Sequence, residues 1–176
     1  MKCESLIKIL NSVGKPSELY VTPDGSRVLV LPYGARVLGL FPQGSDENFF
    51  WTHTALASVG SARAFYRSAQ WHNSGGDRTW ISPEIDVFFP DFPSTEIYRQ
   101  PPQLDPGSYQ IERLGGSFRL VNRLALTLSR SRETVGLVIT KSWGPAPNPL
   151  RHEHALRELA GAEYAGYTQS TTLQLV

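Results

Sequence analysis

The regular alternation of apolar and polar side chains is the feature that most constrains the fold of this chain. Three segments, residues 108–114, 117–129 and 133–143, follow one another with short turns between them. In the middle segment, leucines recur with a period of two: Leu124, Leu126 and Leu128. A period of two is typical of a β-strand that buries one face. Three such strands joined by short turns predict an antiparallel meander.

The first part of the chain also predicts antiparallel strands. Residues 18–22, 26–32 and 35–42 are rich in β-branched and other apolar residues. The turn Pro23-Asp24-Gly25 lies between the first two, where proline presets φ and glycine accepts a positive φ. Residues 48–53, "NFFWTH", predict an aromatic strand after a polar loop.

Helical patterns are few. Residues 4–13 place five apolar side chains on one broad stripe, and Gly14 with Pro16 ends the pattern. From there to residue 148 the sequence predicts strands and loops. Asn148-Pro149 is a plausible helix start, so a second short helix is expected near 149–160. The last residues, 171–176, predict one more strand.

Together these elements predict one mainly β domain over residues 1–176, an antiparallel β-sandwich with two short helices. The final strand predicted over 171–176 runs to Val176 with no polar tail after it. We therefore expect the chain to be the N-terminal part of a longer sandwich. An incomplete sandwich would expose sheet edges and apolar surface, which favours a homo-oligomer.

Composition and charge exclude several classes of function. The chain is 40% hydrophobic and 19% charged, and its formal net charge is +1. Such a balance gives no basic excess for binding nucleic acid or an anionic membrane. No apolar run approaches the roughly 20 residues that span a bilayer. The single cysteine, Cys3, cannot form an internal disulfide, which favours a cytoplasmic location.

Residues 71–84, "WHNSGGDRTWISPE", concentrate side chains that suit a sugar. Trp71 and Trp80 offer flat apolar faces for the C–H patches of a sugar ring. Arg78 supplies a fork of donors for hydroxyl groups, and Asp77 and Glu84 can accept from hydroxyls or orient the arginine.

Other residues of this segment add to the predicted site, although each also has a structural interpretation. His72 could transfer protons near neutral pH, and the pair Gly75-Gly76 permits a sharp turn or a close approach to a ligand. Equally, tryptophans are usually core residues, and Asp77 with Arg78 could form a scaffold ion pair. Residues 88–106, rich in proline, predict an irregular loop over one face of the sheet, where binding residues often lie.

Three stretches resemble, in order, the galactose mutarotase-like superfamily: "YGARVLGLFPQGSDENFFW", "WHNSGGDRTWISPE" and "YAGYTQSTTLQL". The likeness covers about residues 18–176 and is closest to bacterial relatives of the aldose 1-epimerases. Its most distinctive part is Gly-Gly-Asp-Arg-x-Trp-x-x-Pro-Glu. The resemblance implies a large antiparallel β-sandwich with a sugar-binding cleft, and no metal or organic cofactor.

The resemblance also implies a reaction, acid–base epimerisation at an anomeric carbon. In the family a histidine protonates the ring oxygen and a late glutamate acts on the anomeric hydroxyl. The histidine role would fall on His72, where the family pattern His-Gly-Gly is broken by two inserted residues. The glutamate would lie beyond Val176, and Arg78 would position the substrate.

Two alternatives belong to other classes. The first is a carbohydrate-binding module on the same fold, without catalysis. The second is a cupin-like metalloprotein, because His152, His154 and Glu158 have the His-x-His-x3-Glu spacing that holds a divalent transition ion on strands. The helix predicted near 149–160 would point the two histidines about 200° apart, which argues against chelation.

Overall fold

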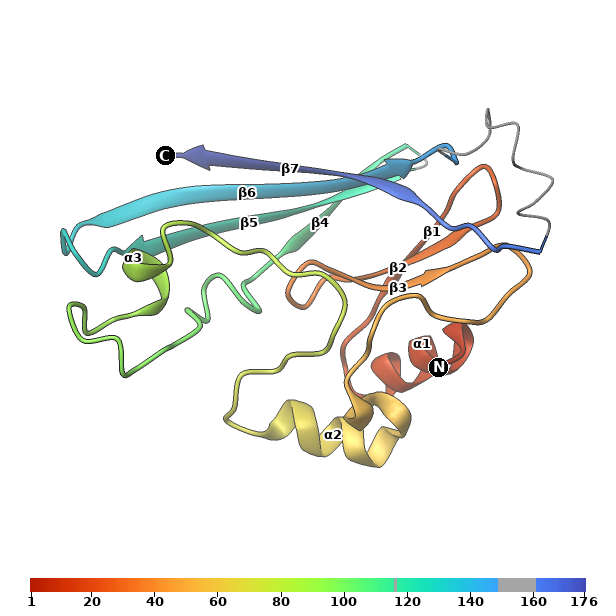
Figure 1. Ribbon diagram of the computed structural model, residues 1–176, viewed down its shortest axis with the longest axis horizontal. Coiled ribbons are helices and arrows are strands. Elements are labelled where there is room, and N and C mark those ends of the chain that lie inside the picture. The colour runs from red at the N-terminus through yellow and green to blue at the C-terminus, as the bar shows by residue number, and fades with distance from the viewer. Residues whose placement is uncertain (116, 149–160) are drawn as a thin grey trace.

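The computed structural model describes residues 1–115, 117–148 and 161–176, which form two antiparallel sheets with short helices (Figure 1). The three-stranded sheet contains, in order, β1 (Glu18–Val21), β2 (Arg27–Leu31) and β3 (Arg36–Phe41). The four-stranded sheet contains, in order, β4 (Gln110–Leu114), β5 (Ser117–Thr127), β6 (Thr134–Pro145) and β7 (Tyr167–Leu175). The sheets pack against each other, so the predicted class, mainly β and sandwich-like, is confirmed.

Two strands of the three-stranded sheet, β2 and β3, are buried on both faces, whereas β1 is partly exposed. Val28 and Val30 of β2 pack toward the four-stranded sheet, in a cluster that includes Phe118 of β5 and Trp143 of β6. Their neighbour Leu29 belongs to a different cluster on the opposite face. Since successive side chains of a strand point to opposite faces, burial on both sides explains why β2 is apolar without interruption.

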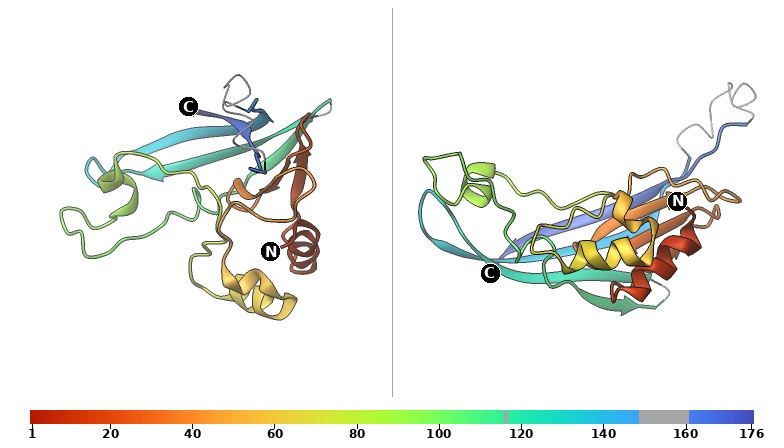
Figure 2. Two further views of the ribbon diagram at one scale, coloured as in Figure 1. Left: turned by 45° about the vertical axis from the view of Figure 1, so that its right-hand side comes forward. Right: turned by 90° about the horizontal axis from the view of Figure 1, so that it is seen from below.

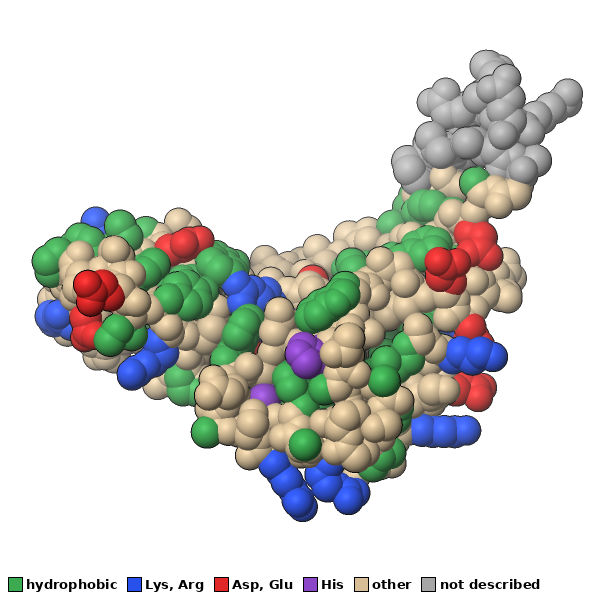
Figure 3. Space-filling view, turned by 60° about the horizontal axis from the view of Figure 1, so that its bottom comes forward, with side chains coloured by type: hydrophobic (Ala, Val, Ile, Leu, Met, Phe, Trp, Pro, Cys, Tyr) green, Lys and Arg blue, Asp and Glu red, His purple; other side chains and the backbone are tan. Residues whose placement is uncertain are grey.

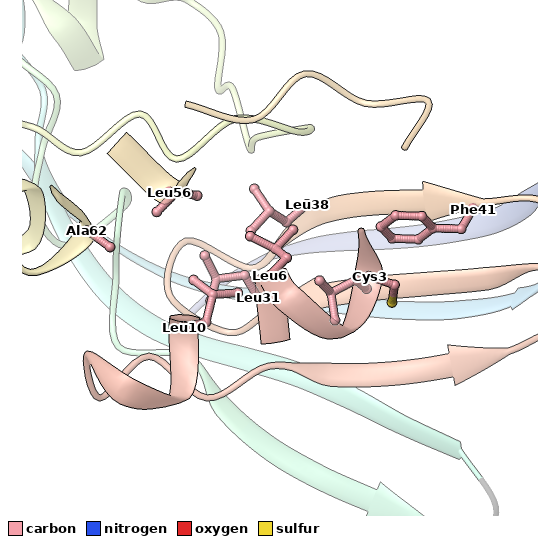
Figure 4. Packing of buried hydrophobic residues seen from close by; sticks show 9 residues of the cluster. Cys3, Leu6, Leu10, Leu31, Leu38, Phe41, Leu56 and Ala62 are labelled. Atoms are coloured by element: carbon pink, nitrogen blue, oxygen red, sulfur yellow. The ribbon is translucent and has the colours of Figure 1, made fainter. Parts of the chain in front are cut away.

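Helices cover the outer face of the three-stranded sheet (Figure 2). These are α1 (Cys3–Ser12), the 3₁₀ helix η1 (Thr54–Ala57) and α2 (Val59–Arg67). Leu6 and Leu10 of α1 point toward Leu31 and Leu38 of the sheet, and all four are fully buried (Figure 4). The predicted N-terminal helix is confirmed to within a residue at each end. No described helix is long and apolar enough to cross a membrane.

The region after β3 differs from the prediction. Residues 48–53 form no strand, and their only pairing is an isolated bridge between Thr52 and Gly75. Phe49 and Trp51 are exposed, so this aromatic run lacks the burial that stabilises a strand. The helix α2 was not predicted, although Ser58 is a recognisable N-cap whose hydroxyl accepts from Ser61 N at 3.2 Å.

The proline-rich stretch, residues 88–106, has no strand and follows the short helix α3 (Glu84–Phe88). Phe88 and Leu104 form a core cluster with Ile139 of β6. The stretch thus covers the part of the four-stranded sheet that the smaller sheet leaves open (Figure 1). The expected irregular excursion over a sheet face is confirmed.

The strand predicted over 171–176 is confirmed and is longer than expected, because β7 begins at Tyr167. It pairs with β6 on one side and is the edge of the sheet among the described residues. Leu173, Leu175 and Val176 are exposed there. A homo-oligomer that covers this edge stays a prediction. The helix expected near 149–160 lies outside the described residues.

Candidate functional site

The glycine pair, Gly75 and Gly76, allows the backbone of residues 71–84 to pack closely against the backbone of neighbouring segments. Gly76 N donates to Trp51 O at 2.9 Å, and Asp77 N donates to Val37 O at 3.2 Å. Gly75 and Gly76 both have positive φ. A Cβ on Gly76 would overlap the Val37 carbonyl, and one on Gly75 would overlap the Trp51 carbonyl. Only glycine fits at these two positions, so Gly75 seats the segment against Trp51 and Thr52, and Gly76 seats it against β3.

Asp77 faces the protein, where it joins the segment to both sheets. Its Oδ1 accepts a hydrogen bond from the Val37 backbone N–H. Its Oδ2 lies 3.5 Å from Nζ of Lys141, a buried residue of β6 that also donates to Ala35 O at 2.8 Å. Burial lowers the pKa of Lys141, and the Asp77 carboxylate opposes that shift. Asp77, expected to bind ligand or orient Arg78, therefore has a scaffold role.

Arg36, which sequence reasoning missed, fixes the other side of the segment. Its side chain is only 1% exposed, and Nη2 donates to Asp105 Oδ2 at 2.7 Å. Nη1 donates at 3.0 Å both to Asn73 Oδ1 and to Gly75 O. One buried guanidinium thus ties β3 to the 71–84 segment and to the proline-rich stretch. A charged residue opening an apolar strand was the available signal.

Arg78 lies in the opposite environment, against two exposed indoles. Its Cζ is 3.8 Å from the Trp80 ring centroid and 4.9 Å from that of Trp71. Trp71 is 37% exposed and Trp80 is 41% exposed. Arg78 makes no hydrogen bond or ion pair with any other residue that the structure describes, and burial lowers the pKa of its guanidinium. The scaffold ion pair between Asp77 and Arg78, the alternative structural interpretation, is not formed.

A hollow of about 460 Å³ adjoins Trp71. Its walls come from three parts of the chain: the turn between β2 and β3, residues 68–72, and the proline-rich stretch. The aromatic side chains in these walls are Tyr33, Trp71, His72 and Tyr98, and the other polar ones are Ser68, Gln70, Arg99, Gln100 and Asp105. In Figure 3, hydrophobic and basic side chains lie side by side between the part of the molecule that contains α3 and the part that contains α2.

His72 lines this hollow, but both its ring nitrogens have protein partners. Nδ1 lies 2.7 Å from the Tyr33 hydroxyl, and Nε2 lies 3.2 Å from Ser68 O. The ring also contacts Phe65 and Tyr66 of α2. This geometry favours a structural role, in which His72 fixes Tyr33 in the wall. Proton transfer by His72 stays a prediction.

Trp80 and Glu84 lie beyond the hollow. The Trp80 ring packs 5.0 Å from Phe88 and 6.4 Å from Tyr98, measured between centroids. Tyr98 therefore joins the indole of Trp80 to the wall of the hollow. Glu84 is exposed at the first residue of α3. Burial lowers the pKa of Arg78, and the negative charge of Glu84 is one of the smaller effects that oppose this shift. Glu84 makes no hydrogen bond to another described residue.

The residues of the hollow that the sequence did not single out lie mostly in the proline-rich stretch. The Gln100 Nε2 atom donates to the Tyr98 hydroxyl at 2.6 Å, which places a polar pair in the wall. The composition of this stretch had indicated a loop with binding residues, but not which of its side chains would point inward. Tyr33 carried no signal, since a tyrosine before glycine is typical of an ordinary turn.

Within the residues that the structure describes, no group of three or more His, Cys, Asp or Glu is placed to hold a metal ion. The other described histidine, His53, caps η1 through Nδ1 and stacks on Phe65 with ring centroids 4.5 Å apart. His152, His154 and Glu158 lie outside the described residues. Comparison with models of known protein families, with curated proteins and with solved structures found no match.

Proposed function

We propose that this protein binds a carbohydrate, or another small polyhydroxylated ligand, at Trp71, Arg78 and Trp80 and in the adjoining hollow. One observation carries the proposal: a guanidinium without an acceptor among the described residues lies against two exposed indoles. The N–H groups of Arg78 have no acceptor among the described residues, so a ligand with hydroxyl groups would supply the acceptor that they lack. The mutarotase-like resemblance implies the same ligand class and stays a prediction.

The chemistry of the surface matches the two kinds of surface on a sugar. Indole faces suit the C–H patches of a pyranose ring, and guanidinium N–H groups suit its hydroxyls. The Tyr98–Gln100 pair and the Tyr33 hydroxyl add donors and acceptors in the wall. The volume, about 460 Å³, lies within the range of small-molecule pockets, roughly 300–1,000 Å³.

The same geometry supports binding more than catalysis. Epimerisation at an anomeric carbon needs an acid and a base within hydrogen-bond reach of the ligand. His72, the candidate acid, is engaged through both nitrogens, and Asp77 faces Lys141. A non-catalytic carbohydrate-binding role is therefore the version of the proposal that the described residues support best. It needs no metal and no organic cofactor.

Saturation-transfer NMR against a panel of free hexoses and pentoses tests the proposal. We expect at least one sugar to receive saturation from the protein. The Arg78→Ala variant should weaken that binding at least about tenfold, because hydrogen bonds to charged groups contribute about 1.5–3 kcal/mol.

The matched control is Trp51→Ala, which removes a third exposed indole that lies outside the hollow. Its affinity for the sugar should equal that of the wild type, whereas Trp71→Ala should lose binding. Equal effects of Trp51→Ala and Trp71→Ala would contradict the proposed site. Anomer exchange, followed by NMR in the same samples, separates an epimerase from a binding module.

A further inference from the structure

A second hollow, of about 410 Å³, lies where the C-terminal ends of α1 and α2 meet. It is distinct from the hollow beside Trp71 and has a different character. Its walls are formed by Ser12, Val13, Lys15, Arg63, Tyr66 and Arg67. Three of these six residues are cations and none is an acid.

The three cations have no acidic partner among the residues that the structure describes. None of the described ion pairs includes Lys15, Arg63 or Arg67. The sequence has no Asp or Glu from residue 48 to residue 76, which includes all of α2. Basic side chains project from this side of the molecule without acidic side chains beside them (bottom of Figure 3).

Arg63 and Arg67 are four residues apart on α2, so they occupy the same face of the helix. Like charges with this spacing destabilise a helix unless a counter-ion lies between them. The negative ends of the two helix dipoles offset part of the charge, but each supplies only about half an elementary charge. Three full positive charges therefore leave an excess in the hollow.

Lys15 is held in place beside the two arginines. Its Nζ lies 3.8 Å from the centroid of the Tyr33 ring and 5.5 Å from that of Tyr66. Its backbone N donates to Leu10 O at 2.9 Å, which fixes the residue at the end of α1. Burial lowers the pKa of Lys15, as expected for an ammonium group that is partly desolvated and lacks a counter-ion.

We propose that Lys15, Arg63 and Arg67 form a binding site for a compact oxyanion, specifically a phosphate group. Two guanidinium forks and an ammonium group around one small hollow suit an anion with several acceptor oxygens. An extended polyanion such as nucleic acid fits poorly, because the net charge of the chain is only +1. The site does not use Trp71 or Arg78, and it adjoins the carbohydrate hollow only through Tyr33, which lies under Lys15 and also lines that hollow.

Titration with inorganic phosphate tests this site, with heteronuclear NMR as the readout at low and constant ionic strength. We expect saturable shifts at residues 12–15 and 63–67, and none with chloride at the same ionic strength. The double variant Arg63→Ala/Arg67→Ala should bind at least about tenfold more weakly. Arg123→Ala, which removes an exposed arginine of β5, is the matched control and should bind as the wild type does.

Two further arms identify the source of the phosphate group. Glycerol phosphate represents soluble phosphate monoesters, and vesicles with phosphatidic acid, compared with pure phosphatidylcholine, represent a lipid headgroup. Lys15→Met provides a second variant that keeps the length of the side chain over Tyr33, and it should also weaken binding. The proposal is overturned if no phosphate probe binds saturably, or if both variants bind phosphate as tightly as the wild type.

Discussion

Arg36 contacts residues 71–84 from β3, and Arg78 belongs to that segment. Both guanidiniums lie near the ring of Trp71, but they differ in burial and in hydrogen bonding. Arg36 is buried and donates to three acceptors, of which one is the Asp105 carboxylate. Arg78 lies against two exposed indoles and makes no hydrogen bond with another described residue. The comparison separates a side of the segment that holds the fold together from a side that is free to bind.

The same division runs along the segment itself. Gly75, Gly76 and Asp77 face β3 and residues 51–52, and they form hydrogen bonds with the protein there. Trp71, four residues before Gly75, and Arg78, immediately after Asp77, face outward. The segment therefore has a structural side and a side that faces solvent. Substitutions on the structural side should lower stability, and substitutions on the other side should weaken ligand binding.

The largest expected effect is on stability, from Arg36→Ala. Removing one partner of a buried ion pair leaves Asp105 uncompensated, which should lower the free energy of unfolding by about 3–5 kcal/mol. Urea denaturation measures the change, with Arg123→Ala as a control that should remain close to the wild type. A loss below about 1 kcal/mol would contradict the structural role of Arg36 and its expected difference from Arg78.

Gly76→Ala should come next. Gly76 and Gly14 have similar positive φ values, 66° and 70°, but only Gly76 has backbone atoms where a Cβ would lie. Gly14→Ala therefore measures the backbone strain alone. We expect Gly76→Ala to cost about 1–3 kcal/mol more than Gly14→Ala, the usual cost of overpacking. Equal thermal stability of the two variants would show that the close approach to Val37 is not rigid.

Arg130 is an intermediate case and predicts a pH dependence. Its guanidinium is mostly exposed, yet it bonds to the buried carboxylate of Asp86, with Nη2 to Oδ2 at 2.6 Å. Hydrogen bonds from Arg130 lower the pKa of Asp86 below its ordinary value. A lowered pKa in the folded state means that the unfolded state binds the proton more readily.

This stabilising contribution is therefore complete above the unfolded pKa, near 3.8, and is lost as the pH falls through the lower folded value. The stability difference between wild type and Asp86→Asn should be constant near neutral pH and shrink below pH about 4. Urea titrations at several pH values measure this difference. A difference that does not change down to pH about 2 would contradict the assigned cause.

The smallest expected effect on stability is that of Arg78→Ala. The stacked guanidinium contributes about 0.5–1 kcal/mol at an exposed site, so the loss should not exceed about 1 kcal/mol. Circular dichroism during thermal unfolding should give nearly the same curve as the wild type. A loss as large as that of Arg36→Ala would mean that Arg78 is part of the scaffold.

The sequence predicted the sheets well because their determinants are local. The period of two in β5 and the apolar stripe of α1 follow directly from the order of residues. The helix α2 was missed because it buries only Ala62 fully, so its pattern is weak. Residues 48–53 were wrongly predicted as a strand, because aromatic residues favour strands only where their side chains are buried.

The candidate site was only partly predictable, because its determinants are distant in sequence. The contact between Asp77 and Val37 joins residues 40 positions apart, and the ion pair of Arg36 with Asp105 joins residues 69 apart. No local pattern could reveal that Asp77 faces inward while Arg78 faces outward. The residue types did indicate a tryptophan–arginine surface, which the structure places on the outside.

The most direct test of the central claim uses the four tryptophans of the chain as internal probes. Each indole Nε1–H gives a separate NMR signal during titration with a sugar that binds. We predict shifts for Trp71 and Trp80, and none for exposed Trp51 or for buried Trp143, whose Nε1 donates to Gln169 at 2.9 Å. Sugar binding that leaves the Trp71 and Trp80 signals unchanged would contradict the account.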